Sequence, residues 1–216
     1  MKLYIYDHCP YCVKACMIFG LKNLPIELVT QLNDDEETPI KMIGQKMVPI
    51  LAKSDGSYMA ESLDIISYIN DIDGNVAIKN MVRTMQVEDW LQEANEFFYF
   101  LCMPRWAEAP LEEFKTAAAK QYFIDKKEGY IGPFAEQMAS STELIKQANN
   151  HLRKLEYLLK STNALNGELT IDDIEVYTIL RGLSIVKGIS YSKRVNEYRQ
   201  NMAKLSKVPL LDEIAI

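Results

Sequence analysis

Three of the four cysteines in this chain lie within eight residues, at Cys9, Cys12 and Cys16. The first two are separated only by a proline and a tyrosine. A pair of thiols at this spacing can perform thiol–disulfide exchange, because one thiolate attacks a disulfide and the second thiol then resolves the mixed disulfide that forms. The spacing therefore points first to redox chemistry.

The residues around the pair predict a strand followed directly by a helix. Leu3–Tyr6 is an aromatic and β-branched run, and Pro10 suits the first turn of a helix that continues to about Lys22. A thiol at a helix start lies among unpaired amide donors at the positive end of the helix dipole, and both stabilise a thiolate. We expect Cys9 to be acidic and exposed, and Cys12, one turn further on, to be shielded and less acidic.

A structural zinc site is the alternative use of such a pair. A closed zinc site needs about four ligands. Outside the cluster the chain offers only Cys102, His8 and His151, and His8 is too close to the pair to be an obvious further ligand. The redox interpretation is favoured, and no metal is expected. Cys102 and Cys16 are interpreted as small apolar core residues, although a redox role for Cys16 stays open.

Two further stretches could bind a peptide-like ligand. Val48-Pro49 places a proline at the start of a predicted strand, where a cis peptide would turn the backbone groups of Val48 outward to pair with an extended ligand. Glu61-Ser62 opens a predicted helix, so the helix amides and the Ser62 hydroxyl suit a carboxylate, while Glu61 suits an ammonium group. Each stretch alone has a plain structural alternative, a strand-initiating proline and a helix N-cap.

The remaining pattern predicts two domains. Residues 1–72 follow the order β-α-β-α-β-β-α, residues 73–83 form a linker, and residues 84–216 are helical throughout. The predicted strands are Leu3–Tyr6, Ile26–Val29, Val48–Leu51 and Tyr58–Met59, and the predicted helices of the first domain are Pro10–Lys22, Glu37–Ile43 and one from Glu61 to near Gly74.

The composition narrows the classes of partner. A net charge of −6 without clustered lysine and arginine argues against binding to nucleic acid or to an acidic membrane surface. No run approaches the length of a membrane span, and the start of the chain does not resemble a signal peptide. A close cysteine pair in such a chain is expected in a reducing, cytoplasmic compartment.

The three features, in this order, resemble the glutaredoxins. Cys9-Pro10-Tyr11-Cys12 is the dithiol motif of that family, Val48-Pro49 matches its cis-proline loop, and Glu61-Ser62 matches its site for the γ-glutamyl group of glutathione. The helical remainder is similar to the second domain of glutathione transferases. There a helix begins with a capping box, here Leu169–Ile174, in which Thr170 and Asp173 would cap the helix. The resemblance covers nearly the whole chain and is closest to the large, two-domain bacterial glutaredoxins.

The resemblance implies a thioredoxin-like α/β domain followed by an all-α, glutathione-transferase-like domain. It also implies a glutathione-dependent oxidoreductase that reduces protein disulfides and protein–glutathione mixed disulfides, with Cys9 as nucleophile and Cys12 as resolving thiol. Glutathione would be the reducing co-substrate, with no tightly bound cofactor, and a monomer is expected. The implied glutathione-binding residues are Tyr11, Val48, Pro49, Glu61 and Ser62.

The sequence departs from the family pattern in two places, and three other functions are disfavoured. Lys14 could serve as the basic residue that often follows the second cysteine, and Ala60-Glu61-Ser62 is closer to the transferases than to small glutaredoxins. A conjugating transferase is disfavoured because Cys9 stands where such an enzyme uses tyrosine or serine. A non-catalytic adaptor has no need of two thiols, and an iron–sulfur carrier is disfavoured because Pro10 makes the loop rigid.

Overall fold

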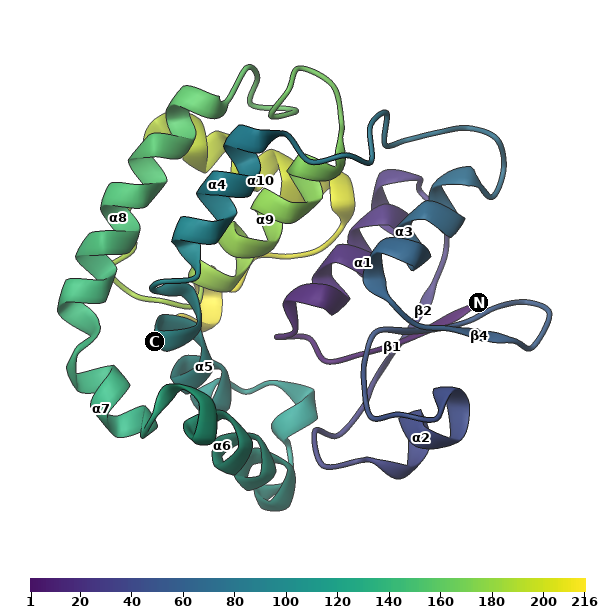
Figure 1. Ribbon diagram of the computed structural model, residues 1–216, viewed down its shortest axis with the longest axis horizontal. Helices are drawn as coiled ribbons and strands as arrows, with labels where there is room; N and C mark the ends of the chain where they lie inside the picture. Colours follow the sequence, from purple (N-terminus) through teal and green to yellow (C-terminus); the bar gives the residue numbers. More distant parts are fainter.

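The computed structural model describes all residues, 1–216, as an α/β domain joined to a helical domain (Figure 1). The α/β domain has the predicted order β-α-β-α-β-β-α. Its elements are β1 (Lys2–Ile5), α1 (Pro10–Leu21), β2 (Glu27–Thr30), α2 (Glu37–Ile43), β3 (Ile50–Ala52), β4 (Tyr58–Met59) and α3 (Ser62–Asp71). Helices α1 and α3 lie side by side on one side of the sheet, and α2 lies on the other (Figure 1).

The sheet brings the start of two helices and one loop to the same edge. Its strand order is β2-β1-β3-β4, with β1 parallel to β2 and antiparallel to β3, and with β3 antiparallel to β4. Strands β1 and β4 therefore end at one edge, where β3 begins, since Tyr4 pairs with Ile50. The first residues of α1 and α3, and the loop that precedes β3, consequently meet at that edge.

Several predicted boundaries need correction, and strand β1 spans Lys2–Ile5 where Leu3–Tyr6 was expected. Strand β2 begins at Glu27, and β3 begins at Ile50, so Val48 and Pro49 precede the strand. Their peptide bond is cis, and a proline has no N–H to donate to a strand ladder. Helix α3 ends at Asp71, before Gly74, and the Nζ of Lys22 donates hydrogen bonds to the carbonyl oxygen of Asn70 in its last turn and to that of Asn75 beyond it.

The helical domain is built around α9, in which every residue is buried. Its N-terminus has the predicted capping box, in which the Thr170 N–H donates to Asp173 Oδ2 at 2.9 Å. The elements are α4 (Met85–Ala94), α5 (Phe98–Glu108), η1 (Glu112–Phe114), α6 (Ala117–Ile131), α7 (Phe134–Ala139), α8 (Ser141–Leu158), α9 (Ile171–Leu183), α10 (Lys193–Ser206) and η2 (Asp212–Ile214). None of the helices combines the length and apolar character needed to cross a membrane.

The two domains pack tightly along α1. One side of α1 contacts α3, and another contacts α9 and α10 of the helical domain. A Cβ atom at Gly20 would lie 1.7 Å from the carbonyl oxygen of Ser206, so only glycine allows α1 this approach to the end of α10. Buried apolar side chains form one continuous core through both domains. The helical domain is thus a fixed neighbour of the helix that begins with the cysteine pair.

Candidate active site

The cysteine pair lies where β1 leads into α1. Cys9 is the N-cap residue of α1 with extended backbone angles, φ −70° and ψ 121°, and proline follows it at the first helical position. Cys12 is buried, and its Sγ accepts a hydrogen bond from the Tyr6 N–H at 3.4 Å. Cys9 is half-buried, so the expectation of an exposed thiol was wrong. Side chains of the helical domain line a cavity in front of it, which the pattern around Cys9 could not indicate.

The pKa values of the two thiols are shifted in opposite directions. The pKa of Cys9 is lowered to about 6, first because the Cys12 thiol donates a hydrogen bond to it, with further contributions from positive charge on His8 and from backbone amides, all against the effect of burial. The pKa of Cys12 is raised, chiefly by burial and then by that same hydrogen bond. The predicted difference in acidity is therefore confirmed. The largest cause of the low pKa of Cys9 is the hydrogen bond from the second thiol, whereas the cause expected from the sequence was its position at the helix start.

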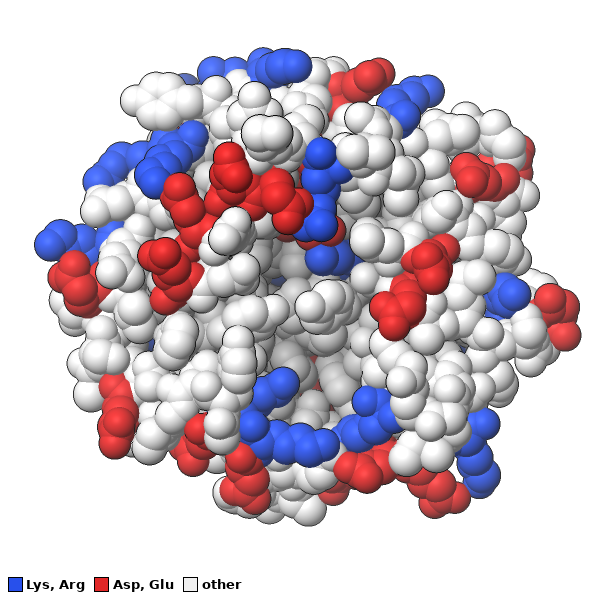
Figure 2. All heavy atoms as spheres, in the orientation of Figure 1, with Lys and Arg blue, Asp and Glu red and all other residues white.

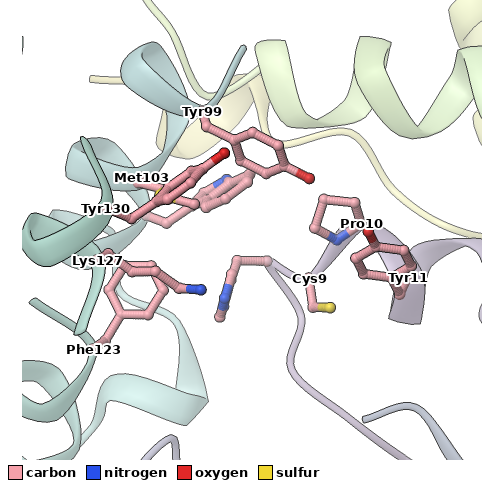
Figure 3. A pocket seen from close by; sticks show the side chains of 10 residues that line it. Cys9, Pro10, Tyr11, Tyr99, Met103, Phe123, Lys127 and Tyr130 are labelled. Carbon is pink, nitrogen blue, oxygen red and sulfur yellow. The ribbon is translucent and has the colours of Figure 1, made fainter. Parts of the chain in front are cut away.

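A cavity of about 420 Å³ opens in front of Cys9, between the two domains (Figure 3). Aromatic and apolar side chains from α5 and α6 face the cysteine across it, and Lys127 reaches in from α6. The lining consists of His8, Cys9, Pro10 and Tyr11 on one side and Tyr99, Met103, Trp106, Phe123, Lys127 and Tyr130 on the other. Such a pocket can accept an apolar group of a substrate whose disulfide lies at Cys9.

A second cavity, of about 240 Å³, shares Cys9 and His8 with the first. Val48 forms part of its wall, and three lysines, Lys46, Lys126 and Lys127, line it from both domains. Basic side chains gather at the lower rim of the hollow between the domains (Figure 2). This side of Cys9 therefore suits a ligand that carries negative charge.

The predicted glutathione-binding residues are distributed around the sheet edge. Tyr11 is half-exposed beside the first cavity, and Val48 lies in the second with Pro49 next to it in the cis linkage. Glu61 is exposed and Ser62 is buried at the start of α3. Neither lines the two cavities, but both lie at the sheet edge where α1 begins. Glu61 has φ 65° and ψ 114°, a strained backbone of the kind found at ligand sites.

Contacts from the helical domain hold the cysteine loop, and none of these contacts was expected from the sequence. Glu113 of η1 accepts hydrogen bonds from His8, and Arg181 of α9 binds the preceding Asp7. Lys14 forms an ion pair with Glu175 of α9 at 2.6 Å, so it is engaged across the domain interface and is not free to serve the thiols. Nothing near these residues in the sequence identifies their partners.

The other two cysteines differ from the pair. Cys102 is fully buried in α5, as predicted. Cys16 is half-buried where α1 faces the end of α10, and burial raises its pKa to about 12. It is less enclosed than the core interpretation implied, and it is far from being a thiolate at neutral pH.

Comparisons with known proteins cover both domains. Residues 86–215 match the family model "Glutaredoxin 2, C terminal domain", and residues 3–76 match "Glutathione S-transferase, N-terminal domain". The chain is 50% identical over 216 residues to glutaredoxin 2 of Escherichia coli strain K12 and to that of strain O157:H7, with 100% of each protein covered.

Solved structures give the same result. The crystal structure of glutaredoxin 2 from Salmonella typhimurium, in complex with glutathione, matches with a TM-score of 0.97 at 50% identity, covering 100% of this chain and 98% of that one. Gtt2 from Saccharomyces cerevisiae matches with a TM-score of 0.59 at 15% identity, over 97% of this chain and 100% of that one, a likeness of fold alone.

Proposed function

The chain belongs to the glutaredoxin 2 family, and from this membership we propose how its residues perform glutathione-dependent thiol–disulfide exchange. Cys9 is the nucleophile and Cys12 is the resolving thiol. The observation that supports this assignment is the opposite shift of the two pKa values, with Cys9 lowered to about 6 and Cys12 raised. At neutral pH the thiolate therefore resides on the residue that borders both cavities.

The reaction on a glutathione mixed disulfide proceeds through one covalent intermediate. The Cys9 thiolate attacks the glutathione sulfur, the protein thiolate leaves, and Cys9 carries glutathione. A second glutathione then attacks that sulfur and releases Cys9 with oxidised glutathione. With a protein disulfide, Cys9 instead bonds to one protein sulfur while the other leaves as a thiolate. Cys12 then attacks the Cys9 sulfur, the second protein thiolate leaves, and two glutathiones reduce the Cys9–Cys12 disulfide that forms. The donated hydrogen bond of Cys12 lowers the energy of Cys9 as a leaving thiolate in both routes.

Glutathione lies along the sheet edge in this proposal. The backbone of Val48, beside the cis bond to Pro49, pairs with the extended peptide part of glutathione. Ser62 and the first amides of α3 bind the γ-glutamyl carboxylate, and Glu61 binds the ammonium group. Tyr11 flanks the glutathione sulfur. The strained backbone of Glu61 fits a residue held in place for a ligand.

We further propose the division into residues 1–72, a linker over 73–83 and a helical domain over 84–216. Glutathionylated and disulfide-bonded proteins are the partners, and the protein acts as a cytoplasmic monomer, where glutathione keeps a close cysteine pair reduced.

Glutathione-dependent reduction of a glutathionylated protein tests the assignment. Cys9→Ser should abolish turnover, because no other thiol is acidic and accessible. Cys12→Ser should retain reduction of mixed disulfides, which needs only one attacking thiol, but lose reduction of protein disulfides. Equal loss in both variants on the mixed disulfide would contradict the two roles.

A further inference from the structure

His8 is held in one orientation beside Cys9 by four aromatic rings and by a contact at its Nδ1. Its ring packs against four aromatic rings at centroid distances of 5.8, 5.2, 5.1 and 5.0 Å, those of Tyr6, Trp106, Phe114 and Phe123. Glu113 Oε1 lies 2.7 Å from His8 Nδ1 and accepts a hydrogen bond from the His8 backbone N–H at 2.9 Å. A ring this closely packed has no freedom to turn, so its two nitrogens have fixed surroundings.

The Glu113 contact determines which nitrogen carries a hydrogen. Glu113 is fully buried, and although burial acts to raise its pKa, the hydrogen bonds and positive charge of His8 lower it overall. A carboxylate only accepts hydrogen bonds, so Nδ1 must donate to it. His8 Nε2 makes no hydrogen bond within the protein, yet it is not sealed off, in contrast to the Nε2 of His151, which is buried without a partner. His8 lines both cavities that Cys9 borders, so Nε2 faces the space where the disulfide reacts.

We propose that His8 is a catalytic proton carrier of this reaction, oriented by Glu113, an inference that rests on the proposed function. When the Cys9 thiolate attacks a glutathione mixed disulfide, the Cys9–glutathione S–S bond forms, the original S–S bond breaks, and Nε2–H of the imidazolium gives its proton to the leaving thiolate. The neutral ring then takes the proton of the incoming glutathione thiol. This proton makes the ring an imidazolium again. The glutathione thiolate attacks the glutathione sulfur bound to Cys9, so that oxidised glutathione forms and Cys9 leaves as a thiolate. Each cycle converts a mixed disulfide and one glutathione into a free thiol and oxidised glutathione.

The charges around His8 are compatible with this role. Glu113 is the carboxylate that contacts the ring, and it compensates the positive charge of the protonated state. The other charged or titratable groups that share the two cavities with His8 are Lys46, Lys126 and Lys127, with Cys9, Tyr6, Tyr11, Tyr99, Tyr122 and Tyr130. Glu113 accepts the hydrogen bond of Nδ1, so Nε2 is the nitrogen left to exchange a proton with a sulfur in the cavities.

The dependence of the rate on the leaving thiol tests the proposal. His8→Asn keeps an N–H donor near the position of Nδ1 for Glu113 but removes Nε2. Single-turnover transfer of glutathione to Cys9 is measured from two mixed disulfides of glutathione, one with an alkyl thiol and one with an acidic nitrothiophenol. Iodoacetamide alkylation of each variant corrects the rates for the fraction of Cys9 that is thiolate. We expect a loss of about tenfold or more with the alkyl thiol and a change within about twofold with the nitrothiophenol, which leaves without a proton.

Two further variants test the role of Glu113 and provide a control at the other histidine. Glu113→Gln keeps a side-chain oxygen that can accept the hydrogen bond of His8 but removes the negative charge. The transfer rate should again fall with the alkyl disulfide and not with the nitrothiophenol disulfide, by a smaller factor than in His8→Asn. Glu113→Gln provides the test if His8→Asn fails to fold. His151→Gln changes the other histidine, which lies at Glu93 outside both cavities, and should leave the ratio of the two rates unchanged.

Equal losses of His8→Asn on both disulfides, or none on either, would overturn the role of His8. The proposed function would stand in that case, because the unaltered protein still turns over and Cys9→Ser does not. An unaltered protein without glutathione-dependent turnover would instead overturn the proposed function itself.

Discussion

The guanidinium of Arg181 donates hydrogen bonds to both the carbonyl oxygen and the Oδ1 of Asp7, at 2.7 and 2.8 Å. The Arg181 side chain is 1% exposed, and its Nε also donates to the carbonyl oxygen of Pro209 at 2.9 Å. One buried side chain of α9 thus joins the loop that leads to Cys9 with the C-terminal segment. The helical domain sets the position of the redox loop through this contact as well as through Glu113.

Arg181→Met should destabilise the protein and loosen this loop. The change leaves two backbone carbonyl oxygens without their donor in a buried interface, and we expect the free energy of unfolding to fall by about 2–4 kcal/mol. Urea unfolding measures it. Arg153→Met is the matched control, because Arg153 is exposed, and should stay within about 0.5 kcal/mol of the parent. Similar values for the two variants would show that the Asp7 contact contributes little.

The acidity of Cys9 should depend on the side chain at position 12. The pKa of Cys9 is about 6, against an ordinary value of 9.0, and the hydrogen bond from Cys12 is the largest cause. Cys12→Ala removes that donor, so the pKa should rise toward the ordinary value. Alkylation by iodoacetamide at pH 7 should then slow by roughly an order of magnitude. Cys12→Ser retains a hydroxyl donor and should shift the pH profile less.

The pH profile of alkylation in the parent has a definite direction. Because the pKa of Cys9 is lowered, the rate of Cys9 alkylation should be near its maximum at pH 7 and should fall as the pH drops through about 6. Identical profiles for the parent, Cys12→Ala and Cys12→Ser would place the cause elsewhere, in His8 or the backbone amides.

The strained backbone of Glu61 should lower the stability of the protein while its carboxylate contributes to glutathione binding. At φ 65° and ψ 114° a residue with a Cβ atom is strained, so Glu61→Gly should raise the free energy of unfolding by about 1 kcal/mol. Glu61→Gln keeps the strain and removes only the charge. Since Glu61 is exposed, we expect roughly a fivefold higher half-saturating glutathione concentration for Gln, about 1 kcal/mol. A glutathione dependence unchanged in both variants would place the γ-glutamyl group elsewhere.

Features whose partners are close in sequence could be predicted. The capping box of Thr170 and Asp173 spans three residues, and Gly44 ends α2 with φ 79°, a conformation that glycine adopts freely. The cysteine pair at the start of α1 is likewise a local feature, and the cis bond to Pro49, which the family resemblance implied, joins two adjacent residues. These features fix helix ends and the position of the cysteine pair, because local backbone geometry decides them.

Features that depend on the packing of the two domains could not be predicted. His8 and Glu113 are 105 residues apart, and Glu113 lies in a polar stretch that gives no sign of being fully buried. Lys14 has a position that suggests a role beside the thiols, yet Glu175 on α9 binds it. Long-range pairs of charges leave no periodic pattern in a sequence, so only the folded chain reveals them.

Cys16 should remain a free and slowly reacting thiol in the oxidised protein. It lies four residues after Cys12, about 6 Å further along α1, and regular helical geometry does not bring such a pair to the distance and torsion of a disulfide. Burial raises the pKa of Cys16 to about 12, so almost none of it is thiolate at neutral pH. Oxidation should therefore form the Cys9–Cys12 bond, and mass mapping of peptides from the oxidised protein should recover Cys16 unmodified.

Cys16→Ala tests the same conclusion through activity and stability. Turnover should stay nearly unchanged, and about 1 kcal/mol of stability should be lost, because the side chain packs where α1 meets the end of α10. Cys102→Ala is the control, since that thiol is fully buried in α5, remote from exchange chemistry, and should also leave turnover intact. Recovery of a Cys12–Cys16 disulfide, or of glutathione attached to Cys16 after mild oxidation, would mean that the third cysteine of the cluster takes part in the exchange after all.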